Sequence, residues 1–134
     1  MSVTGEERHR ARARALELYY ESSLKEREFV DVIDALAVKP DPYTISLLHE
    51  VATHEDWALD LLEGHSKEWS LDRMPLLDRL IMTLALCELQ SEDSPGRAVI
   101  FNEAVEFART YSTDGSPAFV NGLLSACADA AELG

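Results

Sequence analysis

The sequence predicts an all-α protein, a single-domain bundle of about seven helices around one buried helix. Residues 76–89, LLDRLIMTLALCEL, contain only one polar residue, Thr83, between Leu80 and Cys87. A helix that is apolar nearly all round must be buried on every side. Elsewhere, apolar residues recur at helical spacing, and no stretch has the apolar–polar alternation of a half-buried strand. The 134 residues fit one domain, 1–134, formed as one bundle or as two three-helix bundles that share the central helix.

The first third of the chain predicts two helices. After residues 1–5, which we expect to be disordered, the first helix is expected at residues 6–22. Its apolar stripe consists of Ala11, Ala15, Leu18 and Tyr19. The second helix is expected at residues 25–36, with one apolar face formed by Phe29, Val32, Ile33 and Leu36.

Capping residues divide the middle of the chain. Asp41 is a predicted N-cap, and Pro42 follows at the first helical position, where proline is tolerated. Thr53 is expected to cap a fourth helix that ends near Gly64. Pro75 is expected in the first turn of the central helix.

Two more helices are expected after the turn SEDSPG at residues 91–96. Residues 98–111 have a broad apolar arc and a polar arc, as an amphipathic helix requires. Ser116 and Pro117 predict the start of the last helix, with Ser116 as its N-cap.

The central stretch does not predict a membrane span, because about 20 apolar residues are needed and charged residues interrupt this one. Residues 1–14 carry four arginines and no apolar core, which is unlike a signal peptide. Cys87 and Cys127 fall on apolar helix faces without a metal-type spacing, so we interpret them as buried thiols. We therefore expect a cytoplasmic protein without membrane association.

Charge is distributed unevenly along the chain. The formal net charge is −13, yet four of the twelve basic residues are Arg8, Arg10, Arg12 and Arg14. Arg8 and Arg12 share one helix face, whereas Arg10 and Arg14 share a face rotated by roughly 160°. Arginines are electrostatically unfavourable at a helix N-terminus, which favours acidic residues. The cluster is either a solvated helix end or a binding feature.

The sequence lacks the motifs of common catalytic and metal sites. His49, Glu50 and His54 approximate the zinc motif HExxH, but the histidines are five residues apart and point about 140° away from each other. No nucleophile elbow, phosphate-binding glycine loop or dinucleotide fingerprint is present. We expect neither an enzyme nor a metal or cofactor site.

Four segments resemble the NusB family of transcription antitermination factors. RHRARARALELYY is similar to the family's R-x-x-A-R…A…LY start, and LLDRLIMTLALCEL to its D-R-x-I-L-R-x-A-x-x-E-L helix. FNEAVEFAR and SPAFVNGLL are similar to I-N-E-A-V-E-x-A-K and F-V-N-G-x-L. The segments occur in the family's order, and the family fold is two three-helix bundles packed together.

The resemblance implies a non-catalytic RNA-binding protein that acts in transcription antitermination and ribosomal RNA processing. Family members bind the single-stranded RNA element boxA together with NusE, a small-subunit ribosomal protein, and the pair modifies the RNA polymerase elongation complex. By position, the resemblance assigns NusE binding to Tyr20 and Asp78. It assigns RNA binding to the arginine cluster and two aromatic residues: Arg8, Arg10, Arg12, Arg14, Tyr111 and Phe119.

A second interpretation remains open. From residue 15 onward the chain has 8 basic and 23 acidic residues, more acidic than RNA binding requires. The chain could therefore be a NusB-like protein-interaction module without RNA binding. Some relatives are homodimers without NusE, so a homodimer is a further possibility.

Overall fold

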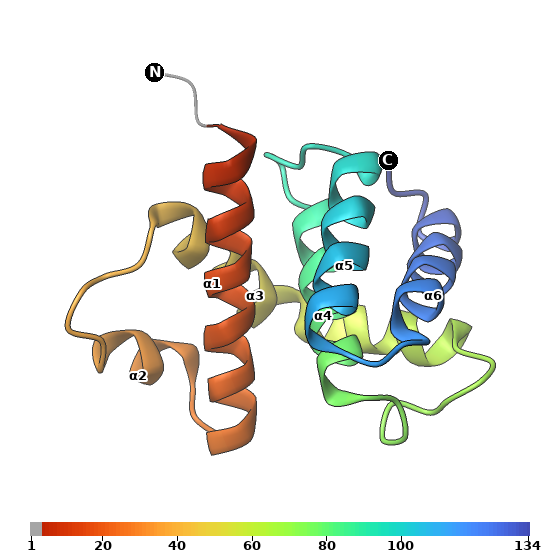
Figure 1. Cartoon of the computed structure of the whole chain (residues 1–134), viewed down its shortest axis with the longest axis horizontal. Coiled ribbons are helices and arrows are strands. Elements are labelled where there is room, and N and C mark those ends of the chain that lie inside the picture. Colours follow the sequence, from red (N-terminus) through yellow and green to blue (C-terminus); the bar gives the residue numbers. More distant parts are fainter. Residues whose placement is uncertain (1–3) are drawn as a thin grey trace.

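The computed structural model describes residues 4–134, and this part of the chain forms six helices (Figure 1). They are α1 (Gly5–Lys25), α2 (Phe29–Asp34), α3 (Pro42–His65), α4 (Leu76–Leu89), α5 (Arg97–Tyr111) and α6 (Ser116–Ala130). Helices α1, α2 and α3 form one group and α4, α5 and α6 a second, with α3 contacting both α4 and α6. The predicted all-α class is confirmed, although the described chain has six helices where about seven were expected.

The difference in helix number arises within α3. This helix runs without interruption for 24 residues, and Thr53 is an exposed residue near its middle. Neither proline nor glycine occurs between Ile45 and Glu63, so nothing in the sequence breaks the backbone hydrogen bonds there. The prediction of an N-cap at Thr53 was therefore wrong. At the start of α3 the predicted cap is confirmed, because Asp41 accepts a 2.7 Å hydrogen bond from the backbone N–H of Tyr43.

The first two helices differ from their expected limits. Thr4 caps α1 by accepting a 3.0 Å hydrogen bond from the N–H of Glu7, so Thr4 and Gly5 belong to the cap and the first turn of α1; residues 1–3 lie outside the described part. At its other end α1 continues to Lys25, where Glu26 takes a left-handed conformation with φ of 52°. Because of this turn, α2 begins only at Phe29 and is six residues long.

Helix α4 is the central element, as predicted. All ten residues from Leu80 to Leu89 are buried, and α4 contacts α1, α3, α5 and α6. Pro75 is the residue just before the first turn, where its missing N–H costs no hydrogen bond. One continuous hydrophobic core includes buried side chains from every helix.

Glycines precede the last two helices. Gly96 has φ of 99°, a conformation that glycine adopts without strain, and it is the residue before α5. Gly115 holds the N-cap position of α6, so Ser116 is the first helical residue and the prediction that it caps the helix was wrong. The side chain of Ser116 is instead buried and hydrogen-bonded within the α5–α6 loop and to α4.

Cys87 and Cys127 are both buried free thiols. Burial raises the pKa of Cys87 to about 12 and that of Cys127 to about 11, which keeps both thiols protonated near neutral pH. Across residues 4–134, no helix combines the length and the apolar character that crossing a bilayer would require.

The buried position of α4 gives a stability prediction. Leu80→Ala and Leu84→Ala should each lower the free energy of unfolding by about 2–5 kcal/mol, since each removes apolar contacts and leaves a cavity. Leu24→Ala makes the same chemical change at a side chain that is 58% exposed, and it should cost under about 1 kcal/mol. Denaturant unfolding of the three variants measures the difference, and equal losses would contradict the central position of α4.

Candidate nucleic-acid interface

Arg12 points into the protein, not toward solvent. Its side chain extends from α1 to α4, where Nε and Nη2 donate hydrogen bonds of 2.8–3.0 Å to the two carboxylate oxygens of Glu88. Arg12 is 4% and Glu88 1% exposed. Burial alone would lower the pKa of Arg12, but the hydrogen bond and charge of Glu88 raise it above its ordinary value. The structure thus corrects the expectation that Arg12 contacts RNA.

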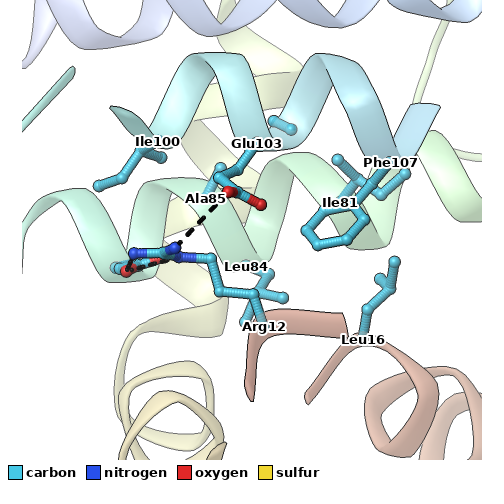
Figure 2. Close-up of a pocket in the computed structure, with 10 residues that line it drawn as sticks. Arg12, Leu16, Ile81, Leu84, Ala85, Ile100, Glu103 and Phe107 are labelled. Carbon is cyan, nitrogen blue, oxygen red and sulfur yellow. Dashed lines mark hydrogen bonds and ion pairs between the residues drawn. The ribbon is translucent and has the colours of Figure 1, made fainter. Parts of the chain in front are cut away.

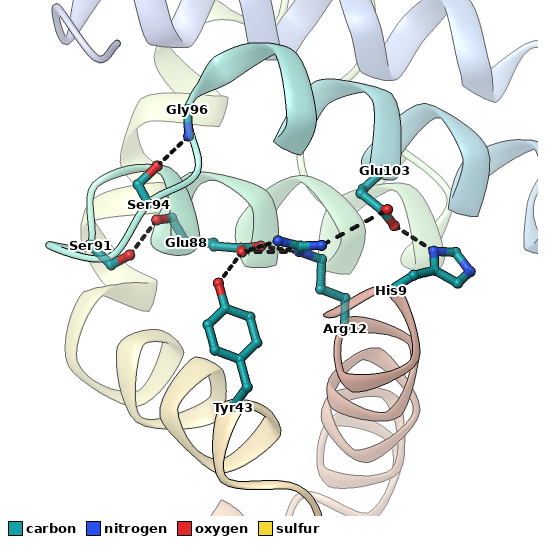
Figure 3. A network of polar contacts seen from close by, with 8 residues as sticks. All are labelled: His9, Arg12, Tyr43, Glu88, Ser91, Ser94, Gly96 and Glu103. Atoms are coloured by element: carbon teal, nitrogen blue, oxygen red, sulfur yellow. Dashed lines mark hydrogen bonds and ion pairs between the residues drawn. The ribbon is translucent and has the colours of Figure 1, made fainter. Parts of the chain in front are cut away.

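The ion pair belongs to a larger polar network that joins four helices (Figure 3). The hydroxyl group of Tyr43, on α3, donates a hydrogen bond to Glu88, and Glu103, on α5, lies 3.9 Å from Nη1 of Arg12. Burial and the hydrogen bond to Glu88 raise the pKa of Tyr43 to about 12. On the outer side of the Tyr43 ring, the guanidinium carbon of Arg8 lies 3.8 Å from the ring centroid, a cation–π contact.

Side chains from α1, α4 and α5 line the space beside this network (Figure 2). Leu16, Ile81, Leu84 and Phe107 line this space together with Arg12 and leave a cavity of only about 10 Å³. Such a volume holds no more than a single water molecule. The packing of these side chains therefore fixes α1 against α4 and α5, and the space between them is not itself a ligand pocket.

A row of aromatic rings runs from α1 along α5. The ring of His9 stacks on Phe107 with centroids 5.1 Å apart, and Phe107 stacks on Tyr111 at 6.3 Å. Nδ1 of His9 is 2.6 Å from a carboxylate oxygen of Glu103, which holds the imidazole in place. The outer members of this aromatic row, His9 and Tyr111, are exposed, whereas Phe107 is buried.

His9 was not among the predicted RNA-binding residues. Its position three residues before Arg12 places both side chains on the same helix face. This spacing was the one feature of the sequence that could have pointed to His9. The stacking on Phe107 could not be inferred from spacing, because the two residues lie 98 positions apart.

The other arginines of the cluster remain on the surface. Arg10 is exposed, and within residues 4–134 neither Arg8 nor Arg10 forms a salt bridge. Arg14 lies 3.4 Å from Glu17, and its side chain is 42% exposed. Arg10 and Arg14 line the same shallow depression with Thr44, away from the side on which Arg12 is buried.

Phe119 is separated from the aromatic row. It lies in the first turn of α6, half-buried against the hydrophobic core, with its ring centroid 5.8 Å from that of Trp69. The structure thus places Tyr111 in one aromatic row with His9, near the start of α1. Phe119 instead contacts Trp69 and the hydrophobic core.

The two residues assigned to NusE binding have different environments. Tyr20 is 38% exposed on α1. Asp78 is only 1% exposed and accepts hydrogen bonds from the hydroxyl groups of Ser112, at 2.5 Å, and Ser116, at 2.8 Å. A carboxylate that is buried and doubly hydrogen-bonded is not a surface contact, so the expectation for Asp78 is corrected. It instead holds the α5–α6 loop on the first turn of α4.

The other groups that could hold a metal ion are scattered. In the described chain, no three histidine, cysteine or carboxylate side chains converge on one point. Nε2 of His54 lies 3.5 Å from a carboxylate oxygen of Glu50, on the same helix. Together, the fold and the surface define an all-helical protein of two packed helix groups, with stacked rings where α1 meets α5 and surface arginines on the other sides of α1.

The chain belongs to the NusB family, whose family model matches residues 9–129. It is 39% identical over 129 residues to the transcription antitermination protein NusB of Salinispora arenicola, covering 91% of this chain and 95% of that protein. It is also 39% identical over 121 residues to the NusB protein of Pseudarthrobacter chlorophenolicus, covering 87% and 89% of the two chains.

Solved structures have the same fold. NusB of T. maritima superposes with a TM-score of 0.81 at 24% identity, covering 96% of this chain and 93% of that one. A chain from a crystal structure of the antitermination factors NusB and NusE in complex with dsRNA superposes with a TM-score of 0.75 at 25% identity, covering 92% and 96%.

The buried ion pair can be tested by breaking it. Arg12→Ala should lower the free energy of unfolding by about 3–5 kcal/mol, because it leaves the Glu88 carboxylate buried and uncompensated. Arg14→Ala removes a partly exposed arginine from the same helix and should cost about 0–1 kcal/mol. The double variant Arg12→Met/Glu88→Leu should recover most of the loss in urea unfolding. A double variant at least as unstable as Arg12→Ala would contradict a coupled pair.

Proposed function

We propose that this chain is a non-catalytic transcription antitermination factor that binds boxA-like single-stranded RNA together with NusE. It would act in the cytoplasm, on transcription and processing of ribosomal RNA, and reach the RNA polymerase elongation complex only through its partners. The observation that carries the proposal is the aromatic row His9–Phe107–Tyr111, whose two end rings are exposed, beside the helix that carries the arginine cluster, in a chain of the NusB family.

The arginines and the rings would have separate roles on RNA. Arg8, Arg10 and Arg14 supply positive charge for phosphates, since Arg12 is neutralised by Glu88. A single strand lets its bases stack on exposed rings, and each such contact contributes roughly 1–3 kcal/mol. Tyr111, 51% exposed at the end of the row, is the ring best placed for a base. Phe119 is a second candidate at a separate position, half-buried beside Trp69.

The small number of surface arginines predicts weak electrostatic attraction, and therefore weak RNA binding by the chain alone. Three arginines near phosphates give a salt slope of about −2 for a single strand. Most of the remaining surface is acidic and opposes binding at low salt. NusE would therefore have to supply further RNA contacts.

Tyr20 is the residue that we propose for the NusE contact, because it is a large, partly exposed ring and rings of this kind commonly anchor interfaces. Asp78 would act indirectly by holding the α5–α6 loop. The acidic surface would accelerate encounter with a basic ribosomal protein.

A module that binds protein but not RNA is the second candidate function. The burial of Arg12 and the net charge of −13 favour it, since both reduce the positive charge available to RNA. In this case the chain would act through NusE, or as a homodimer.

Charge reversal tests the RNA site. Arg8→Glu/Arg10→Glu should abolish binding to a boxA-like oligonucleotide, measured by fluorescence anisotropy with NusE present. The melting temperature should change by no more than a few degrees, because Arg10 is exposed and Arg8 is only half-buried. Arg27→Glu/Lys39→Glu makes the same change in charge at two exposed residues near α2 and should reduce binding far less. Equal loss in both double variants, or no RNA binding by the wild type, would favour the interaction module.

Removal of one ring tests base stacking. Tyr111→Ala should weaken RNA binding by roughly 1–3 kcal/mol, and Tyr111→Phe should retain most of the affinity because stacking needs the ring and not the hydroxyl group. The salt slope should be the same for both variants. A change in the slope would show that Tyr111 acts through the charged groups instead.

The NusE surface can be tested separately from RNA. Tyr20→Ala should weaken NusE binding by about 2 kcal/mol or more in titration calorimetry, as for a central interface ring. Asp78→Asn should affect the α5–α6 loop more than NusE affinity, which backbone hydrogen exchange at residues 112–116 would detect. Unchanged NusE affinity in Tyr20→Ala would remove Tyr20 from the interface.

A further inference from the structure

A groove runs between α2 and α3 on the first helix group. It consists of two adjoining depressions of about 290 and 330 Å³ that share Glu28, Phe29 and Ala52 in their walls. The first continues toward Lys39, and the second toward Tyr19 at the side of α1. We call this feature the α2–α3 groove. Helix α2 lies on the opposite side of α1 from α5 (Figure 1), so the groove is separate from the aromatic row.

The middle of the α2–α3 groove is apolar and open. Val30 is 61% exposed, although removing the surface of a valine side chain from water would lower the free energy. Phe29, Ile33 and Ile45 are half-buried at its sides, and Leu48 is buried beneath. An open apolar floor with polar edges is typical of a site that receives side chains from a partner.

Carboxylates predominate along the edges of the groove. Glu26, Glu28, Asp34 and Glu55 line it, against only two cations, Arg27 and Lys39. Arg27 is partly engaged, since its Nη2 donates a hydrogen bond to the backbone oxygen of Asp31. The groove therefore repels phosphates and favours a ligand that carries positive charge beside apolar groups.

We propose that the α2–α3 groove binds a short cationic amphipathic segment of a partner protein. Its aliphatic side chains would enter the floor between Val30 and Ile45, and its lysines or arginines would lie against Glu28 and Asp34. This is the helix-in-groove form of peptide recognition, with charge complementarity setting the choice of ligand. A second copy of this chain fits poorly, because two chains of net charge −13 would bring acidic surfaces together. The proposed partner surface adds to the RNA and NusE sites and does not depend on them.

The test uses the whole chain and a synthetic helical peptide of leucine and lysine, LKKLLKLLKKLL, as the probe. In titration calorimetry Val30→Ser should weaken peptide binding by about tenfold or more, because it removes apolar surface from the groove without changing its charge. Val99→Ser is the matched control, since Val99 is also exposed, at 44%, but lies on α5 outside the groove. It should leave the affinity within about twofold. Unchanged melting curves would show that both variants fold.

A second pair of variants separates the groove from general attraction between a cationic peptide and an acidic protein. Glu28→Gln/Asp34→Asn should weaken binding more than Glu63→Gln/Asp60→Asn, which removes the same two charges from exposed positions outside the groove. Equal weakening by the two pairs, or by the two valine variants, would overturn the proposal.

Two other ligands of the α2–α3 groove would each give a distinct result, and either result would also overturn the proposal. Displacement of the peptide by NusE would assign the groove to the NusE interface. A dimer that sedimentation velocity detects for the wild type and not for Val30→Ser would assign it to self-association. Binding of boxA-like RNA should be unchanged in Val30→Ser, so failure of this proposal and failure of the RNA proposal give different results.

Discussion

The buried ion pair between Arg12 and Glu88 is the interaction on which the arrangement of the two helix groups depends. Two charges removed from water are stable only when their mutual attraction and further hydrogen bonds offset the lost hydration. Here Tyr43 donates to Glu88, and Glu103 approaches the free side of the guanidinium group. In residues 4–134, no buried side-chain nitrogen or oxygen lacks a hydrogen-bond partner. The pair therefore specifies one relative position of α1, α3, α4 and α5.

This arrangement also determines what the basic start of α1 can present to solvent. Because Arg12 is fixed inside, the helix cannot rotate, and Arg10 and Arg14 must face outward. Glu103 links the interior to the surface, since one carboxylate oxygen faces Arg12 and the other contacts His9. The alignment of His9 with Phe107 and Tyr111 is thus a consequence of core packing and does not require a bound ligand.

The sequence predicted the elements of the fold better than the positions of charged side chains. The run of apolar residues in 76–89 leaves no polar face, so burial of α4 followed from composition alone. Thr53 was misjudged because a capping residue type was present without any residue that ends the preceding helix.

Arg12 and Asp78 were misassigned for a different reason. Arg12 shares a face with Leu16 and Tyr19, at i, i+4 and i+7, so helical spacing indicated an inward position. The arginine cluster suggested the surface instead, and the compensating Glu88 is 76 residues away. Likewise, Ser112 and Ser116, which satisfy Asp78, belong to a distant loop. Local sequence shows that a charge lies near the core, but only the tertiary structure shows which residue compensates it.

The uninterrupted α3 helix has a mechanical consequence. Its 24 residues span about 36 Å at 1.5 Å per residue, and it packs against α1 in the first group and against α4 and α6 in the second group. A break at Thr53 would have created a hinge between the two helix groups, whereas the continuous helix connects them rigidly. Cooperativity between ligands on the two halves would then arise from contacts that the ligands make with each other, and not from a change in the angle between the helix groups.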